Sequence, residues 1–156
     1  MTEAQESLLE KENYRAIIES LSKKTPLTHN DSLMLGISYY KTNNFEKAET
    51  FFEQLQTEAP TSEITTYLII SKIKCNKLMA AMKLYESLCN TENENIIKFI
   101  EKKDYKNALN LTLFLKSIPL ELPKKEAKSN DLTQLATTYN YGELSLKLAE
   151  KTKNNH

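Results

Sequence analysis

A short pattern that recurs five times along the chain constrains its fold more than any other feature. Each copy has a polar residue, then an aromatic residue or leucine, then further mostly apolar positions three and seven residues later. The copies begin at Asn13-Tyr14, Asn44-Phe45, Lys77-Leu78, Asp104-Tyr105 and Asn140-Tyr141. Steps of three and four residues share one helix face, and Asn or Asp in front suits a helix N-cap. The pattern therefore predicts five helix starts, 27 to 36 residues apart.

The scarcity of turn residues also favours helices over sheets. The 156 residues include only two glycines and four prolines, too few for the tight turns of a sandwich or barrel. A spacing near 30 residues is typical of repeats made of two helices, so each pattern marks the second helix of a hairpin. We predict an all-α fold, a stack of antiparallel helix hairpins with about three to five helix pairs.

Residues 29–62 carry the clearest hairpin. Gly36 and Ala48 are small where its two helices would meet. In identity and spacing the segment resembles the tetratricopeptide repeat (TPR) at Leu35, Gly36, Tyr39, Ala48, Phe52 and Pro60. It departs from the family pattern at Ser32, where the family prefers tryptophan, and at Leu55, which replaces a small residue. The resemblance implies a right-handed, TPR-like α-solenoid that forms a single domain over residues 1–156. The best repeat opens at Thr28, with Asp31 placed to complete a capping box.

The other hairpins are expected to be degenerate. We expect further repeats at about 63–91, 92–117 and 130–153, and an opening helix pair within residues 3–24. The second helix of the 92–117 unit is apolar on both faces, so residues 130–153 are expected to fold back and cover it.

A proline segment separates the last two repeats. Pro119 and Pro123 enforce an extended path before a lysine-rich stretch. Two interpretations stay open for it. It is either a connection that positions the last helices, or a strip formed by Ile118, Leu120 and Leu122 that contacts a partner or covers a groove until displaced.

The composition argues against catalysis and against nucleic-acid binding. Basic and acidic residues both number 21, and Arg15 is the only arginine, so the bidentate contacts that phosphate favours are almost absent. Only His29 and His156 could serve as a neutral-pH base, and Cys75 and Cys89 lack metal-ligand spacing. We predict no enzyme, no cofactor and no metal. A nucleic-acid binder built on lysines is a minor hypothesis; it would use Lys72, Lys74, Lys77 and Lys83.

Acidic residues at helical spacing occur at Glu46, Glu49 and Glu53. We interpret them as a solvated helix face, because glutamate is a common surface helix former and no histidine accompanies them.

A concave surface formed by the first helices of stacked hairpins is the expected partner-binding site. The candidate binding residues are Leu33, Ile37, Tyr40 and Lys41 in the first repeat and Tyr67, Ile70, Ser71 and Lys74 in the second. One TPR subclass grips a peptide carboxylate through lysine and asparagine at two of these positions. Leu33 and Ile37 stand there instead, so we expect capture of a hydrophobic or amphipathic segment of a partner protein.

The leading functional hypothesis is a non-enzymatic adaptor or chaperone. By size and layout the chain is similar to the small helical-repeat chaperones of bacterial type III secretion, which implies a homodimer through Leu8, Leu9, Ile17 and Ile18. The alternative is a constitutive scaffold subunit of a larger assembly. The polar, acidic N-terminus lacks the order of a signal peptide, and no long apolar run suits membrane insertion, so we expect a cytoplasmic protein.

Overall fold

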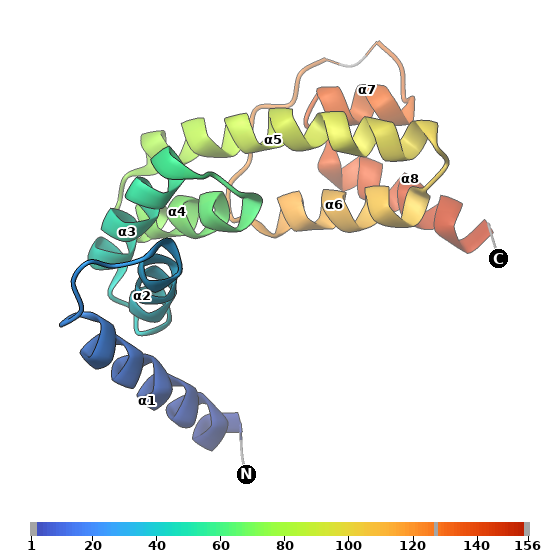
Figure 1. The fold of residues 1–156 in the computed structure, drawn as a ribbon. Helices are drawn as coiled ribbons and strands as arrows, with labels where there is room; N and C mark the ends of the chain where they lie inside the picture. The colour runs from blue at the N-terminus through green and yellow to red at the C-terminus, as the bar shows by residue number, and fades with distance from the viewer. Residues whose placement is uncertain (1–2, 127, 155–156) are drawn as a thin grey trace. The chain divides into compact units, whose positions relative to one another are not determined.

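The computed structural model describes the backbone of residues 3–126 and 128–154, and the side chains from residue 10 onward. All regular secondary structure in these ranges is α-helical (Figure 1), which confirms the predicted all-α class. The helices are α1 (Glu3–Leu21), α2 (His29–Lys41), α3 (Phe45–Glu58), α4 (Ser62–Lys74), α5 (Leu78–Glu101), α6 (Tyr105–Ser117), α7 (Leu132–Thr137) and α8 (Tyr141–Asn154).

The chain divides into two compact units, where the sequence analysis expected one domain. Unit 1 is Met1–Ala81 and holds α1 to α4 with the first turn of α5. Unit 2 is Met82–His156 and holds the rest of α5 with α6, α7 and α8. In unit 1, α2 packs against α1 and α3, and α3 also packs against α4. In unit 2, α6 packs against α8, which also contacts α7.

The hairpin of α2 and α3 is built as its sequence predicts. The Thr28 side chain accepts from the Asp31 N–H and the Asp31 carboxylate accepts from the Thr28 N–H, so the capping box is complete. Ala48 and Phe52 of α3 are fully buried. A Cβ added to Gly36 would lie 3.0 Å from Phe52 Cε1, so glycine is what allows these helices to approach so closely.

Four turns between helices share one backbone conformation. The residues two positions before α3, α5, α6 and α8 have positive φ: Asn43 (65°), Asn76 (62°), Lys103 (60°) and Tyr139 (61°). In each turn the next N–H bonds to a carbonyl five residues back, at 2.8 to 2.9 Å. This is the Schellman motif that ends a helix. The recurrence confirms four of the five predicted helix starts, at Phe45, Leu78, Tyr105 and Tyr141.

Lys103→Gly is expected to stabilise unit 2. Lysine pays a steric cost in the left-handed region that glycine avoids, and the Lys103 side chain is exposed. We expect the free energy of unfolding to rise by about 0.5–1 kcal/mol in urea titrations. Lys106→Gly, inside α6, is the matched control and should lower it by about 1 kcal/mol. If both substitutions lowered the free energy of unfolding, the claim that Lys103 pays a steric cost at positive φ would be contradicted.

Two expected helix boundaries are wrong. The opening helix pair is a single helix, α1, which runs through Asn13 without a break. The boundary expected near Glu92 is also absent, because α5 continues from Leu78 to Glu101. Near that point the Asn90 and Asn93 side chains accept hydrogen bonds from tyrosine hydroxyls. These amides therefore hold other parts of unit 2 instead of capping a new helix, and the repeats expected at 63–91 and 92–117 share one helix.

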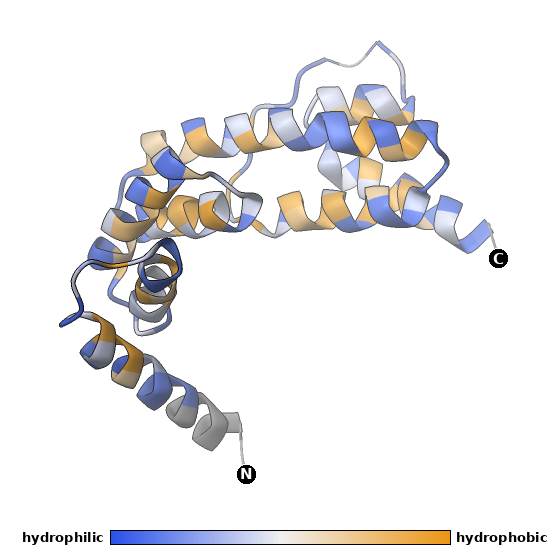
Figure 2. Ribbon diagram, viewed as in Figure 1, coloured by the Kyte–Doolittle hydropathy of each residue, from blue (hydrophilic) through white to orange (hydrophobic). Residues whose placement is uncertain are grey.

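Apolar residues dominate α6 (Figure 2), and α8 packs against this helix. The core of unit 2 includes Leu115 of α6 and Leu144 and Leu148 of α8, all fully buried. The segment after the prolines therefore folds back onto α6, as the apolar pattern of that helix predicts. Leu113 remains 46% exposed, so the cover is incomplete.

Candidate functional site

Seven of the eight candidate binding residues lie on a partly exposed surface of α2 and α4, which we call the tyrosine face. Its members from α2 are Leu33, Ile37, Tyr40 and Lys41, and those from α4 are Tyr67, Ile70 and Lys74. The five uncharged side chains are half-buried, whereas both lysines are exposed. The two helices also contact each other. The predicted residues of two repeats therefore form one surface in unit 1.

The centre of the tyrosine face is an aromatic cluster. The rings of Tyr40 and Tyr67 meet edge to face, with centroids 4.9 Å apart. Tyr40 also meets Phe45 edge to face at 5.5 Å, and Tyr67 stacks on Phe52 at 5.0 Å. These geometries are the favoured ones for aromatic pairs. Because Phe52 is fully buried, the ring face of the half-buried Tyr67 rests on the core of unit 1.

The two tyrosines remain neutral well above physiological pH. Burial raises the pKa of Tyr40. Burial also raises the pKa of Tyr67, with further contributions from Glu63, Tyr40 and Tyr14. The tyrosine face adjoins α1 through α2, against which α1 packs. Of the residues proposed for a dimer, Ile17 and Ile18 are half-buried on α1. The side chains of Leu8 and Leu9 lie outside the described residues.

Positive charge borders the aromatic cluster. Lys74 Nζ lies 5.9 Å from the centroid of the Phe45 ring, a cation–π arrangement. Lys41 and Lys74 occupy the last turns of α2 and α4. Neither lysine makes an ion pair with any side chain that the structure describes. The tyrosine face thus combines apolar contact area with two cations that are free to meet a carboxylate.

Ser71 was predicted to bind a partner, and its position corrects that prediction. Its side chain is 0% exposed, on the α4 face that also buries Ile64 and Leu68. The residues buried in α4 follow spacings of three and four, and Ser71 continues that series. Its hydroxyl has no hydrogen-bond partner among the described residues, and neither has that of Ser38, which occupies a similar buried position in α2.

Ser71→Ala is expected to stabilise unit 1 or leave it unchanged. A buried hydroxyl without a partner pays its desolvation cost with no return, and alanine removes that cost without a large cavity. We expect the free energy of unfolding to rise by up to about 1 kcal/mol in chemical denaturation. Thr112→Ala is the comparison for a buried hydroxyl that does have a partner, because the Thr112 hydroxyl donates to the Ala108 carbonyl at 2.8 Å. A loss above about 1 kcal/mol for Ser71→Ala would show that its hydroxyl is satisfied.

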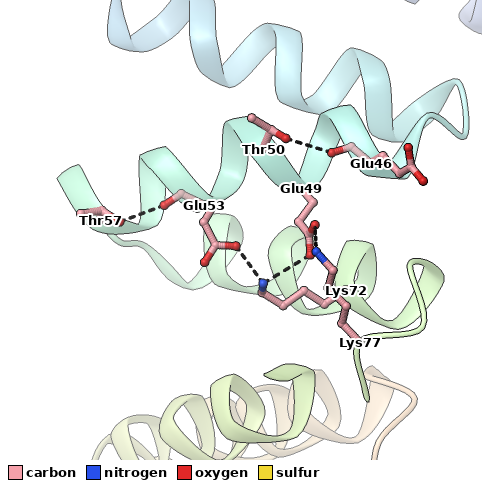
Figure 3. Close-up of polar contacts among 7 residues, drawn as sticks. All are labelled: Glu46, Glu49, Thr50, Glu53, Thr57, Lys72 and Lys77. Atoms are coloured by element: carbon pink, nitrogen blue, oxygen red, sulfur yellow. Dashed lines mark hydrogen bonds and ion pairs between the residues drawn. The ribbon is translucent and has the colours of Figure 1, made fainter. Parts of the chain in front are cut away.

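A network of four charged side chains joins α3 to α4 and the following turn, and the sequence analysis missed it (Figure 3). Lys72 Nζ lies 2.8 Å from Glu53 Oε2 and 3.3 Å from Glu49 Oε2. Lys77 Nζ lies 2.7 Å from Glu49 Oε1. Glu49 is only 8% exposed, which corrects its assignment to a solvated face. One sequence signal could have predicted the network: Lys72 falls on the same face of α4 as Leu68 and Ile69, and a lysine on an apolar face needs a carboxylate partner.

The network holds its members in their charged forms. Burial alone would raise the pKa of Glu49, but the hydrogen bonds from Lys77 and Lys72 outweigh it and the pKa is lowered. Burial would lower the pKa of Lys72, but Glu53 and Glu49 raise it. The nucleic-acid hypothesis loses support, because Lys72 and Lys77, two of its four lysines, already contact carboxylates.

The two cysteines and His29 are the other described residues weighed for catalysis or metal binding. No group of three metal-ligating side chains occurs among the residues that the structure describes. Cys89 is buried and Cys75 is half-buried, and burial raises the pKa of both thiols, which makes them poor nucleophiles. His29 is exposed at the start of α2. No described helix is long and apolar enough to span a bilayer.

No protein-family model, curated protein or solved structure matches this chain. The fold defines its class as an all-α protein with two compact helical units. Any finer assignment depends on the chemistry of the tyrosine face.

Proposed function

We propose that the chain is a TPR-like helical-repeat module, an adaptor or chaperone that binds an amphipathic segment of a partner protein on the tyrosine face. The observation that carries this proposal is the aromatic cluster of Tyr40, Tyr67 and Phe45 beside two lysines without ion pairs. Large aromatic side chains contribute strongly to binding at protein interfaces, and unpaired cations at the rim favour a partner of opposite charge.

The packing of the cluster supports a binding role. Phe52 stacks on Tyr67 with an interplanar angle of 8°, and Tyr40 is held between Phe45 and Tyr67. Side chains that are ordered before binding lose little conformational entropy when a partner docks. The tyrosine face therefore offers a partner a largely preorganised aromatic surface.

The charges define the partner segment more closely. Leu33 and Ile37 offer no hydrogen bond to a carboxylate, so the apolar part of the face suits aliphatic or aromatic side chains. Lys41 and Lys74, in the last turns of their helices, suit an acidic residue at one end of the segment. The proposed ligand is a segment with apolar anchors and an adjacent Asp or Glu.

Selection from a random peptide library on the immobilised protein tests this function. We expect enrichment of segments that combine apolar anchors with acidic residues. Leu33→Glu with Ile37→Glu should weaken binding of the selected peptides by at least about 100-fold, because it places two carboxylates against an apolar ligand. The matched control is Leu113→Glu with Leu146→Glu, which alters two exposed leucines of unit 2 and should leave binding unchanged.

Circular dichroism must show that both double variants remain helical. Peptides that bind the Leu33→Glu, Ile37→Glu variant as well as the unchanged chain would refute the proposal. The narrower form of the proposal, a secretion chaperone, requires in addition that the natural partner be a largely hydrophobic secreted protein.

One observation favours the alternative function, a permanent subunit of a larger assembly. Several large apolar side chains are exposed, namely Met34, Leu78, Met79, Leu113 and Leu146, and Met79 reaches 80%. Permanent neighbours would cover such positions. This alternative predicts that the isolated chain associates or aggregates, and that Met79→Lys with Leu78→Lys restores a monomer in sedimentation experiments.

A further inference from the structure

A cavity of about 150 Å³ lies in unit 2, beside the extended proline segment that begins at Ile118. Tyr85 of α5 and Tyr139 and Tyr141 around the start of α8 form one side of it. Leu120 and Leu122 of the proline segment form another. The apolar strip of the proline segment therefore lies against other residues of unit 2. A cavity of this volume can hold a ring the size of benzene.

The aromatic walls of the cavity are fixed by hydrogen bonds to neighbouring helices. Each tyrosine hydroxyl donates to an acceptor on α5 or α6. The bonds join Tyr85 to the Leu115 carbonyl at 2.9 Å, Tyr139 to Asn90 Oδ1 at 2.6 Å and Tyr141 to Asn93 Oδ1 at 2.6 Å. Because the hydroxyls are already paired, the rings offer apolar contact area to whatever enters the cavity.

Gly142 also lines this cavity, and nothing among the described residues requires a glycine there. A Cβ added at this position would meet no atom within 4 Å, and the residue does not have positive φ. Glycine in a helix is unfavourable relative to alanine, so α8 gains nothing from it. Gly36, the other glycine, is explained by Phe52. Gly142 thus combines a place in the cavity lining with open space where a side chain would stand.

The charges around the cavity are unbalanced. Lys116 and Lys124 line it, against the single carboxylate of Glu121. Lys116 Nζ makes one weak hydrogen bond, to Ser145 Oγ at 3.4 Å, and none of the three side chains takes part in an ion pair between described residues. The three charged side chains are exposed, whereas the tyrosines are buried. A cavity lined by aromatic and leucine side chains, with an excess of ammonium groups at its exposed side chains, favours an anion that carries an apolar body.

We propose that this cavity binds a small carboxylate with a compact apolar body, about the size of benzoate. The carboxylate meets the Lys116 and Lys124 ammonium groups, and the apolar body lies against Tyr85, Tyr141 and Leu122. The open space at Gly142 leaves room for the ligand beside the start of α8. This site lies wholly in unit 2 and is independent of the tyrosine face in unit 1.

Titration of the full chain with benzoate, followed by ¹H–¹⁵N NMR, tests the site. We expect saturable shifts at Gly142, Glu143 and the backbone of residues 120–124, with a Kd of about 1 mM. Benzyl alcohol has a similar shape without the charge and should bind at least about 10-fold more weakly. Acetate, which lacks the ring, should also bind more weakly. Absence of benzoate shifts at about 20 mM, or equal affinity for benzyl alcohol, would overturn the proposal.

Two sets of variants locate the binding. Lys116→Met with Lys124→Met keeps the side-chain stems and should weaken benzoate binding about 10-fold. Gly142→Leu places a large side chain in the cavity lining and should abolish the shifts, whereas Gly142→Ala fits the open space and should preserve them. Unchanged affinity in Gly142→Leu would place benzoate elsewhere and overturn the assignment. The spectra themselves report whether each variant remains folded.

Discussion

Replacing Phe52 by alanine is expected to lower the free energy of unfolding by about 3–5 kcal/mol, the largest loss for any single truncation in unit 1. The ring is 0% exposed, stacks on Tyr67 and fills the space that Gly36 leaves open. Its removal costs apolar burial and creates a cavity between α2 and α3 that these helices can only partly close. Such a loss is a large part of the stability of an ordinary domain.

Urea unfolding monitored by circular dichroism checks this value. Phe51→Ala is the matched control, because Phe51 is the preceding residue of α3 but is half-buried and stacks on Tyr39 at 5.8 Å. We expect it to cost about half as much. Since Phe52 supports Tyr67, Phe52→Ala should also weaken peptide binding on the tyrosine face. Equal losses for the two variants would show that the core of unit 1 is not centred on Phe52.

Lys72→Met is expected to lower the free energy of unfolding by about 2 kcal/mol, although methionine preserves most of the buried stem. The substitution removes both ion pairs of Lys72 and leaves the 8% exposed Glu49 with only Lys77 as its counter-charge. A buried carboxylate that loses a partner pays much of its desolvation cost. Lys77 remains in place, so the loss is smaller than for an isolated buried pair.

The double variant Lys72→Met, Glu49→Leu separates charge from packing. An apolar pair at a buried position is often as stable as the ion pair it replaces, so the double variant should come within about 1 kcal/mol of the unchanged chain. Glu53→Gln is the control for an exposed partner: the Glu53 side chain is 58% exposed, and its substitution should cost less than about 1 kcal/mol. If the loss of unfolding free energy in the double variant equalled the sum of the losses for Lys72→Met and Glu49→Leu measured singly, this account of the network would be contradicted.

Local signals in the sequence predicted much of unit 1 and the class of the fold. The polar-aromatic pattern located the starts of α3, α5, α6 and α8, because each follows a turn with the same backbone conformation. The capping box at Thr28 is a contact between neighbours in sequence, and Gly36 marked a close helix approach. Features that depend on residues three or four positions apart can be read from the chain itself.

Features that depend on distant contacts could not be predicted in this way. Asn90 and Asn93 lie inside α5 and do not cap a new helix. Their side chains accept hydrogen bonds from the hydroxyls of Tyr139 and Tyr141, nearly 50 residues away in the sequence. The burial of Glu49 depends on a lysine of the next helix, at position 72. Ser71 was misassigned because it lies where the exposed and buried faces of α4 meet, directly after the half-buried Ile70, and a step of one residue there separates surface from core.

Hydrogen–deuterium exchange of the full chain, with and without a selected acidic amphipathic peptide, tests the central claim most directly. The account predicts slower exchange in α2 and α4, over residues 33–41 and 67–74. It also predicts that this protection disappears in the Leu33→Glu, Ile37→Glu variant. Protection confined to unit 2, or unchanged in that variant, would contradict the claim that the tyrosine face binds partner proteins.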